Sequence, residues 1–241
     1  MKRLAVENLV CRHGLLTAVR GVSFELQAGE VRCLIGANGA GKTTLMRALA
    51  GAHPAAEGRI LLGDEDVTSL GTSRRVRGGI AMSPEGRRLF ADMTVRENLV
   101  IAAENGRKGE WNLERVLHAF PQLVPLIDKL AGGLSGGQRQ AAAIGRALLS
   151  NPDILLLDEV SLGLSPAAVE GVYASLGAIK SARTMTMLVV EQDLTRALAF
   201  ADRILCMAEG RIELSGAPGD FTRGQITAAY FGIHDGGTAN A

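Results

Sequence analysis

The stretch from residue 30 to residue 50 constrains the fold of this chain more strongly than any other. Residues 30–35 form a short run typical of a β-strand, and residues 42–50 have the apolar spacing of a helix. Between them lie Gly36-Ala-Asn-Gly-Ala-Gly41-Lys42-Thr43. This order satisfies the pattern G-x-x-x-x-G-K-[ST], and the strand–loop–helix context distinguishes it from a chance match in a glycine-rich turn. The segment therefore predicts a loop that binds phosphate groups.

Each residue type in this loop has a chemical reason. Glycines allow backbone N–H groups to surround phosphate oxygens, and the N-terminus of the following helix adds a partial positive charge. We expect the Lys42 ammonium to contact the β- and γ-phosphates and the Thr43 hydroxyl to ligate Mg²⁺. The predicted nucleotide-binding residues of the loop are Gly36, Ala37, Asn38, Gly39, Ala40, Gly41, Lys42, Thr43 and Thr44.

A second apolar strand ends in two acids. Residues 154–157 are a continuous apolar run, as expected for a parallel strand covered on both faces, and Asp158 and Glu159 follow. We expect Asp158 to hold Mg²⁺ through water and Glu159 to accept a proton from an attacking water. Two acids at a strand end are weak evidence alone, because a solvated strand end has the same composition. The phosphate loop about 115 residues earlier makes the two acids strong evidence for metal binding and proton acceptance.

Composition excludes several other classes of protein. Hydrophobic residues make up 47% of the 241 residues and the net charge is +1, which disfavours a disordered chain and gives no charge-driven reason to expect nucleic acid as a partner. Three cysteines (Cys11, Cys33 and Cys206) without C-x-x-C spacing predict reduced, buried thiols in a cytosolic protein. The 30 glycines exceed the average usage of about 7%, which predicts many turns defined by the backbone.

No segment has the pattern of a membrane span or a signal peptide. The longest stretch without Asp, Glu, Lys or Arg is 12 residues, 116–127, whereas a bilayer-spanning helix needs about 20. Glu7 interrupts the apolar run that a signal peptide would need. We expect the polypeptide to be soluble and to stay in the compartment where it is made.

Alternating strand and helix patterns predict an α/β core on a largely parallel sheet. Strands are expected at residues 4–8, 24–26, 58–62, 80–83 and 186–190, with a turn around residues 13 and 14 and a hairpin at 203–207 and 211–215. Residues 94–149 read as mostly helical, beginning with a capping box of Thr94 and Glu97. Pro166 is placed at the first turn of another helix, which precedes one at 194–201.

The segment before the acidic strand carries a family resemblance. Leu134, Ser135, Gly136, Gly137 and Gln138 stand between the phosphate loop and the acids, and together these motifs resemble those of ATP-binding-cassette (ABC) ATPases. Ser135 can cap a helix that runs to about residue 149, and the glycines expose the backbone N–H groups of that helix start to an anion. In the family this signature closes over the γ-phosphate bound by the opposite subunit of a head-to-tail dimer.

The resemblance covers essentially the whole chain and implies its fold class. We expect a P-loop NTPase (RecA-like) α/β core on a mainly parallel sheet, with an N-terminal antiparallel β subdomain and an inserted α-helical subdomain. Residues 1–231 are read as one ABC ATPase domain, divided at about residues 90 and 150, with the signature in the helical middle part. Residues 232–241 are expected to be a flexible tail.

Further positions match the family in order. His13 stands where an aromatic ring usually stacks on adenine, although a plain turn histidine is the alternative. Residues 161–164 resemble the loop that crosses the dimer interface. Glu85 stands where a Gln usually senses Mg²⁺ and the γ-phosphate, and it can still bind the metal through an oxygen or simply face solvent. That loop joins the helical insertion, which in the family contacts the transmembrane subunit.

Two departures from the family pattern, Glu85 and Gln192, narrow the resemblance to a subfamily, and a third, Val160, departs from that subfamily's own pattern. Glu85 replaces Gln, Gln192 stands at the switch-histidine position, and Val160 stands where Pro usually follows the catalytic Glu. Pro84-Glu-Gly-Arg87 together with Val190-Glu-Gln192 is similar to one ATPase subunit of branched-chain amino-acid importers. Because Gln is neutral, it retains a hydrogen-bond donor but cannot shuttle a proton. We therefore expect Glu159 to carry hydrolysis and Gln192 to contribute only by positioning.

The resemblance implies an ATPase, with ATP and Mg²⁺ as cofactors, that powers an importer of branched-chain or related amino acids. Its expected partners are a second ABC ATPase subunit, more often non-identical, membrane permease subunits and, indirectly, a solute-binding protein outside the membrane. The expected location is peripheral, on the cytoplasmic face of the inner membrane. An exporter ATPase and a soluble ABC ATPase acting on nucleic acid are alternatives. Co-purification of permeases or of RNA distinguishes them.

Overall fold

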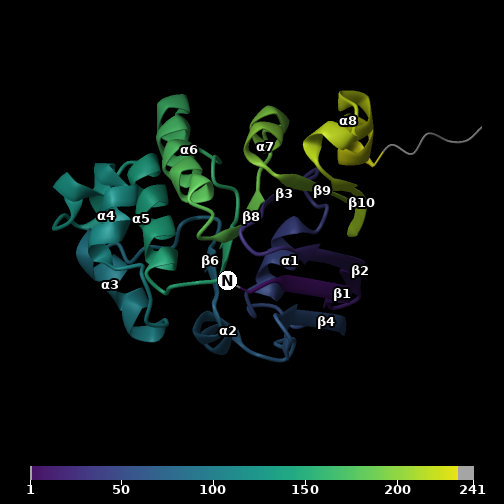
Figure 1. Cartoon of the computed structure of the whole chain (residues 1–241), viewed down its shortest axis with the longest axis horizontal. Coiled ribbons are helices and arrows are strands. Elements are labelled where there is room, and N and C mark those ends of the chain that lie inside the picture. The colour runs from purple at the N-terminus through teal and green to yellow at the C-terminus, as the bar shows by residue number, and fades with distance from the viewer. Residues whose placement is uncertain (1, 233–241) are drawn as a thin grey trace, which may run out of the picture.

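The computed structural model describes residues 2–232 of the chain. The predicted tail lies outside the described residues except for Gly232, which ends the last helix. Two sheets and a helical region make up the described part (Figure 1). Within residues 2–232, no helix has the length and apolar character needed to cross a membrane.

A six-stranded sheet in the order β10-β9-β3-β8-β7-β6 forms the centre of the molecule. Its first five strands in chain order are parallel, and the last pairs antiparallel with its neighbour, as the predicted hairpin required. The strands are β3 (Val31–Ile35), β6 (Ile80–Ser83), β7 (Ile154–Leu157), β8 (Thr186–Val190), β9 (Arg203–Ala208) and β10 (Arg211–Gly216).

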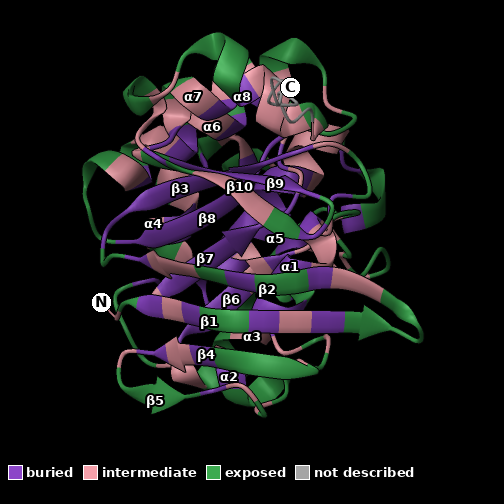
Figure 2. Cartoon of the chain, turned by 90° about the vertical axis from the view of Figure 1, so that its right-hand side faces the viewer, coloured by how far each residue is buried: buried purple, intermediate pink, exposed green. Residues whose placement is uncertain are grey.

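The central strands are buried on both faces, which explains their continuous apolar sequences. In β7, Leu155 and Leu157 belong to one core cluster, whereas Ile154 and Leu156 belong to the other. Figure 2 shows the resulting layers, with helices on one side of this sheet and the second sheet on the other. The predicted α/β architecture is therefore confirmed.

The second sheet is antiparallel, in the order β2-β1-β4-β5, and its hairpin is longer than predicted. Its strands are β1 (Leu4–His13), β2 (Leu16–Leu26), β4 (Glu57–Leu62) and β5 (Glu65–Asp66). The prediction of strands only at 4–8 and 24–26 was too short, because register shifts after Val6, Leu9 and Cys11 break the two-residue alternation. A strand with bulges loses the period by which it is predicted.

Helix α1 (Lys42–Leu49) lies between the two sheets and contacts β1 and β2. The opposite face of the central sheet is covered by α5 (Gly136–Leu148), α6 (Pro166–Ser181), α7 (Leu194–Phe200) and α8 (Arg223–Phe231). Helices α3 (Val95–Asn105) and α4 (Leu113–Ala119) gather with α5 to one side (Figure 1). Short segments complete the chain: α2 (Thr72–Gly78), η1 (Pro121–Leu126), η2 (Ala131–Gly133) and η3 (Pro218–Asp220).

The predicted helix starts agree with the structure. Thr94 and Glu97 form the capping box of α3, Ser135 caps α5, and Pro166 occupies the first turn of α6. Helices α2 and α8 were not predicted, since both are short, with seven and nine residues. The division at residues 90 and 150 remains a prediction.

A buried arginine binds the last carbonyl groups of α1, the helix that follows the phosphate loop. Arg75 is 1% exposed, and its Nη1 donates to the carbonyls of Ala48 and Leu49, both at 2.7 Å. Its remaining nitrogens donate to the carbonyls of Leu70 and Thr68. Burial lowers the pKa of Arg75 to about 10. The side chain thus satisfies the last carbonyls of α1 and places a positive charge at the negative end of its dipole.

Replacing Arg75 with Met is expected to lower the free energy of unfolding by about 3 kcal/mol, because buried carbonyls lose their donors. Urea denaturation of the full chain measures this effect. The neighbouring Arg74 is exposed, so Arg74→Met is the matched control and should change stability by less than about 0.5 kcal/mol. Equal stabilities of the two variants would show that the Arg75 contacts do not support the fold.

Candidate functional site

The candidate site lies at the carboxyl edge of the central sheet, where parallel strands bring the residues that follow them together. The phosphate loop follows β3, Asp158 follows β7, and Gln192 and Glu85 each lie two residues beyond β8 and β6. A pocket of about 520 Å³ opens there. It is lined by His13, Leu16, Ala18, Asn38, Gly39, Gly41, Lys42, Thr43, Thr44, Glu85, Glu159, Leu162 and Gln192.

Two glycines of the loop are required by packing as well as by backbone angle. Gly36 has a φ of 147°, and a Cβ atom there would lie 2.1 Å from the carbonyl oxygen of Met207. Gly41 has a φ of 103°, and its Cβ would lie 2.3 Å from the carbonyl oxygen of Ala18. Any side chain at either position would displace a neighbouring strand, so the loop holds one shape against β9 and β2.

Lys42 lies within this loop. Only 4% of the residue is exposed, and its Nζ donates to the carbonyls of Gly36 at 2.7 Å and Ala37 at 2.9 Å. Burial lowers the pKa of Lys42, while the nearby charges of Glu159 and Asp158 act in the opposite direction. Its hydrogen-bond partners are neutral carbonyls. A phosphate entering the pocket therefore offers this buried cation an anionic partner.

Asp158 is a buried carboxylate beside the phosphate loop. It is 2% exposed, and its backbone N–H donates to the Ser83 carbonyl at 3.0 Å. Among residues 2–232, neither Asp158 Oδ1 nor Ser83 Oγ has a hydrogen-bond partner, although both are buried. Burial raises the pKa of Asp158 to about 6, and the charges of Glu159 and Glu85 add to that rise. These oxygens fit a hydrated Mg²⁺ ion.

Glu159 and Gln192 are in direct contact. Gln192 Nε2 donates to Glu159 Oε1 at 2.8 Å, which fixes the direction of the carboxylate. Both residues line the pocket beside Lys42 and Thr43. Glu159 has a φ of 51°, the left-handed region that non-glycine residues rarely occupy, and Val160 beside it is fully buried. The sequence predicted both residues in the site but not the bond between them.

The other predicted residues have mixed positions. His13 is exposed at the pocket, with its Nε2 3.1 Å from Thr44 Oγ1 and its ring centroid 4.5 Å from that of His53. Stacking of His13 on a base remains a prediction. Glu85 is exposed, and it lines both this pocket and a neighbouring one of about 730 Å³ that also reaches Asp158. Its role at the metal therefore also remains a prediction.

The signature residues lie outside the nucleotide pocket of their own chain. None of Leu134, Ser135, Gly136, Gly137 and Gln138 lines it. Ser135 Oγ accepts from the Gln138 N–H at 3.3 Å, and Gln138 Oε1 accepts from the Ser135 N–H at 2.9 Å. A Cβ on Gly137 would lie 2.6 Å from Ala168 Cβ, so this helix start packs closely on α6.

Arg87 connects three parts of the site, and the sequence had placed it in a motif without giving it a role. Its Nε donates to Gln140 Oε1 of α5 at 3.0 Å, and its Nη2 donates to the Leu162 carbonyl at 2.9 Å. Arg146 of α5 in turn donates to the Arg87 carbonyl at 3.1 Å. The Glu85 loop is thereby tied both to the signature helix and to the loop after Glu159.

Sequence reasoning also assigned no role to Glu191 or Tyr173. The only signal for Glu191 was its position as an acid directly after an apolar strand.

Comparison with known proteins identifies relatives along the whole chain. The family model described as ABC transporter matches residues 19–161. The high-affinity branched-chain amino acid transport ATP-binding protein BraG of Pseudomonas aeruginosa is 38% identical over 232 residues, covering 95% of this chain and 99% of the relative. The probable branched-chain amino acid transport ATP-binding protein LivF of Archaeoglobus fulgidus is 34% identical over 197 residues, 81% and 84% of the two chains.

A solved structure agrees with these relatives. The ADP conformation of MJ1267, an ATP-binding cassette of an ABC transporter, superimposes with a TM-score of 0.79 at 30% identity and covers 95% of each chain. The family match spans more than half of the chain, and the fold, the loop and the acidic edge agree with it. The chain belongs to the ABC transporter family and is an ATPase of that family.

Proposed function

We propose that this chain is the ATP-hydrolysing subunit that powers an importer of branched-chain or related amino acids. The observation that carries the proposal is the single pocket in which Lys42, Glu159 and Gln192 meet at the phosphate loop. Support for the cargo comes from the two relatives named for branched-chain amino acid transport. The cargo itself does not enter this pocket, so these residues cannot select it.

Binding of ATP is assigned to residues 36–44. The loop backbone would surround the phosphates, and Lys42 would exchange its two carbonyl partners for phosphate oxygens. Thr43 and Asp158, with Glu85 beside them, would hold Mg²⁺, which when bound neutralises charge on the phosphates. The orphaned Asp158 oxygen supports this assignment.

Hydrolysis is assigned to Glu159. Its carboxylate lines the pocket and can accept a proton from a water that attacks the γ-phosphate. Gln192 cannot accept that proton at neutral pH, because an amide has no basic site there. Its contribution is to hold the Glu159 carboxylate at 2.8 Å.

The signature supports a working unit of two cassettes. Since residues 134–138 lie away from the pocket of their own chain, they would act on the nucleotide of a second cassette, homologous or identical. We place this pair peripherally on the cytoplasmic face of the membrane, bound to permease subunits and served by a solute-binding protein. An exporter ATPase or a soluble ABC ATPase remains the alternative.

Replacing Gln192 with Ala is expected to lower the steady-state rate of ATP hydrolysis about tenfold and to leave ATP affinity within about twofold, because only the direction of Glu159 is lost. Phosphate release and equilibrium binding of a fluorescent ATP analogue measure the two quantities. Gln122→Ala in η1, whose residues do not line the pocket, is the control. An unchanged rate in the Gln192 variant would refute the positioning role.

Co-purification tests the transport assignment. The full chain is isolated from its native membranes with a mild detergent, and its partners are identified. We expect integral permeases and a second cassette, and we expect the reconstituted assembly to take up leucine or a related amino acid when ATP is supplied. Recovery of RNA or ribosomal proteins without permeases would favour the soluble class. Outward transport by the assembly would favour the exporter.

A further inference from the structure

A buried carboxylate beside the site gathers four hydrogen-bond donors. Glu191 is 0% exposed and follows β8 directly. Its Oε1 accepts from Ser161 Oγ at 2.7 Å and from the backbone N–H groups of Gln192 at 2.9 Å and Asp193 at 3.0 Å. Its Oε2 accepts from the hydroxyl of Tyr173. These contacts come from three separate elements of the fold.

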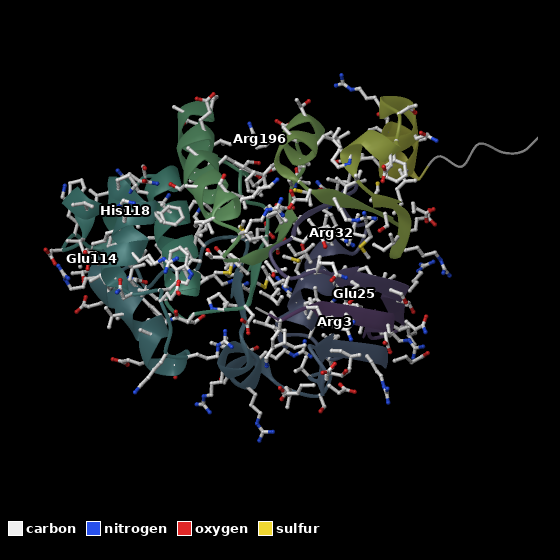
Figure 3. All side chains as sticks on the ribbon, viewed as in Figure 1. Arg3, Glu25, Arg32, Glu114, His118 and Arg196 are labelled. Carbon is white, nitrogen blue, oxygen red and sulfur yellow. The ribbon has the colours of Figure 1, made fainter. Side chains whose placement is uncertain are left out.

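All four donors to Glu191 are neutral groups, two of them side-chain hydroxyls and two backbone N–H groups. An unpaired buried charge is costly, and a carboxylate avoids that cost only when hydrogen bonds occupy its oxygens. Burial and the Glu191 charge raise the pKa of Tyr173, so its hydroxyl stays protonated and remains a donor. Arg196, labelled in Figure 3, lies over the ring of Tyr173 with Cζ 5.4 Å from the ring centroid.

Two of the donors belong to residues that lie next to Glu159 or contact it, namely Ser161 and Gln192. Ser161 lies two residues after Glu159, in the loop that leaves β7. Gln192 follows Glu191, and its side chain donates to Glu159 Oε1 at 2.8 Å. The Glu191 carboxylate therefore restrains the loop after Glu159 through Ser161. Through the backbone of Gln192 it also restrains the side-chain amide that contacts Glu159.

We propose that Glu191 is a positioning residue for hydrolysis, which sets the geometry of Glu159 through Ser161 and Gln192. This inference rests on the proposed function, since it assumes that Glu159 accepts the proton. Glu191 does not line the pocket, and within residues 2–232 its side chain forms no hydrogen bond with the phosphate loop or with Lys42. It acts on the rate and not on the binding of ATP.

The first variant is Glu191→Gln, which keeps the size of the side chain. The amide oxygen can take the place of Oε1 and the NH₂ group can donate to the Tyr173 hydroxyl, but a neutral oxygen holds the three donors to Oε1 more weakly than a carboxylate does. We expect kcat to fall about tenfold, with the affinity for a fluorescent ATP analogue within about twofold of the parent. The rate is measured on the full chain together with the partners that co-purify with it.

A buried acid at the opposite edge of the same sheet is the matched control. Glu30 is 7% exposed and accepts from Arg32 Nε at 2.6 Å and from the Gln27 N–H at 2.9 Å (Arg32 is labelled in Figure 3). Glu30→Gln makes the same chemical change directly before β3, where Glu30 pairs with the buried Arg32, and Glu30 does not line the pocket. We expect it to lower stability and to leave kcat unchanged. A purely structural role for Glu191 would make the two variants alike.

A double substitution tests the route of the effect. If Glu191 acts through Ser161 and Gln192, then Glu191→Gln should change kcat by less than about twofold in a Ser161→Ala/Gln192→Ala background. Additive effects in that background, or a normal kcat for Glu191→Gln, would overturn the proposal. Should Glu191→Gln not fold, Ser161→Ala alone must lower kcat, and a normal rate there overturns it equally.

The same experiment separates this inference from the proposed function. Glu159→Gln is measured in parallel. Loss of hydrolysis in Glu159→Gln with normal hydrolysis in Glu191→Gln would overturn only the inference. Normal hydrolysis in Glu159→Gln would overturn the assignment of the base on which the inference rests.

Discussion

Replacing Glu159 with Gln is expected to lower the rate of ATP hydrolysis between about a hundredfold and a thousandfold while ATP binding is kept, because the variant loses the proton acceptor but not the phosphate loop. The amide has nearly the size of the carboxylate, and Gln192 can still contact its oxygen. Since ATP is then bound but not consumed, the two-cassette state should also accumulate. Phosphate release measures the first effect, and light scattering with Mg²⁺ and ATP measures the second.

The control for this variant is Glu170→Gln. Glu170 is an exposed acid on α6, so the same chemical change there should leave the rate within about twofold. A rate near that of the parent chain in Glu159→Gln would place the base elsewhere in the pocket. Loss of binding together with hydrolysis would instead point to damage to the fold.

Replacing Lys42 with Ala is expected to weaken ATP binding about a hundredfold or more, because the β- and γ-phosphates lose a cation that is buried in the loop. The fold should survive, since removing a buried ammonium also removes its desolvation cost. Thermal unfolding with and without ATP measures both properties. ATP should raise the melting temperature of the parent chain and leave that of the variant nearly unchanged.

Lys129→Ala provides the matched control, because Lys129 is exposed and precedes the signature segment without lining the pocket. It should bind ATP as the parent chain does. An ATP-dependent rise in the melting temperature of Lys42→Ala equal to that of the control would contradict the role of Lys42.

Strands buried on both faces were predicted well from the sequence. Ile154–Leu157 and Thr186–Val190 are found with the expected bounds, because a short continuous apolar run fits a central strand covered on both faces. Ile80–Ser83, at the edge of the sheet, also has the expected bounds. The β1–β2 hairpin was underestimated, since its bulges remove the alternation that predicts a strand. A local sequence pattern thus predicts a strand well when the strand has the same environment along its whole length.

The site residues divide in the same way. The loop around Lys42 and the pair Asp158 and Glu159 were predicted because motif spacing and strand ends are local features. The bond from Gln192 to Glu159 depends on β8 lying beside β7, although 28 residues separate Leu157 from Thr186. Contacts of this kind follow from strand order and not from spacing. The four donors of Glu191 belong to this second class.

The assignment of ATP binding to Lys42 and of hydrolysis to Glu159 is tested by measuring binding and turnover in the same samples. The full chain with its co-purified partners is assayed for ATP affinity and for phosphate release, with Glu159→Gln and Lys42→Ala alongside it. We expect binding and turnover in the parent assembly, binding without turnover in the Glu159 variant, and neither in the Lys42 variant. Turnover by Glu159→Gln at the rate of the parent assembly would contradict this assignment.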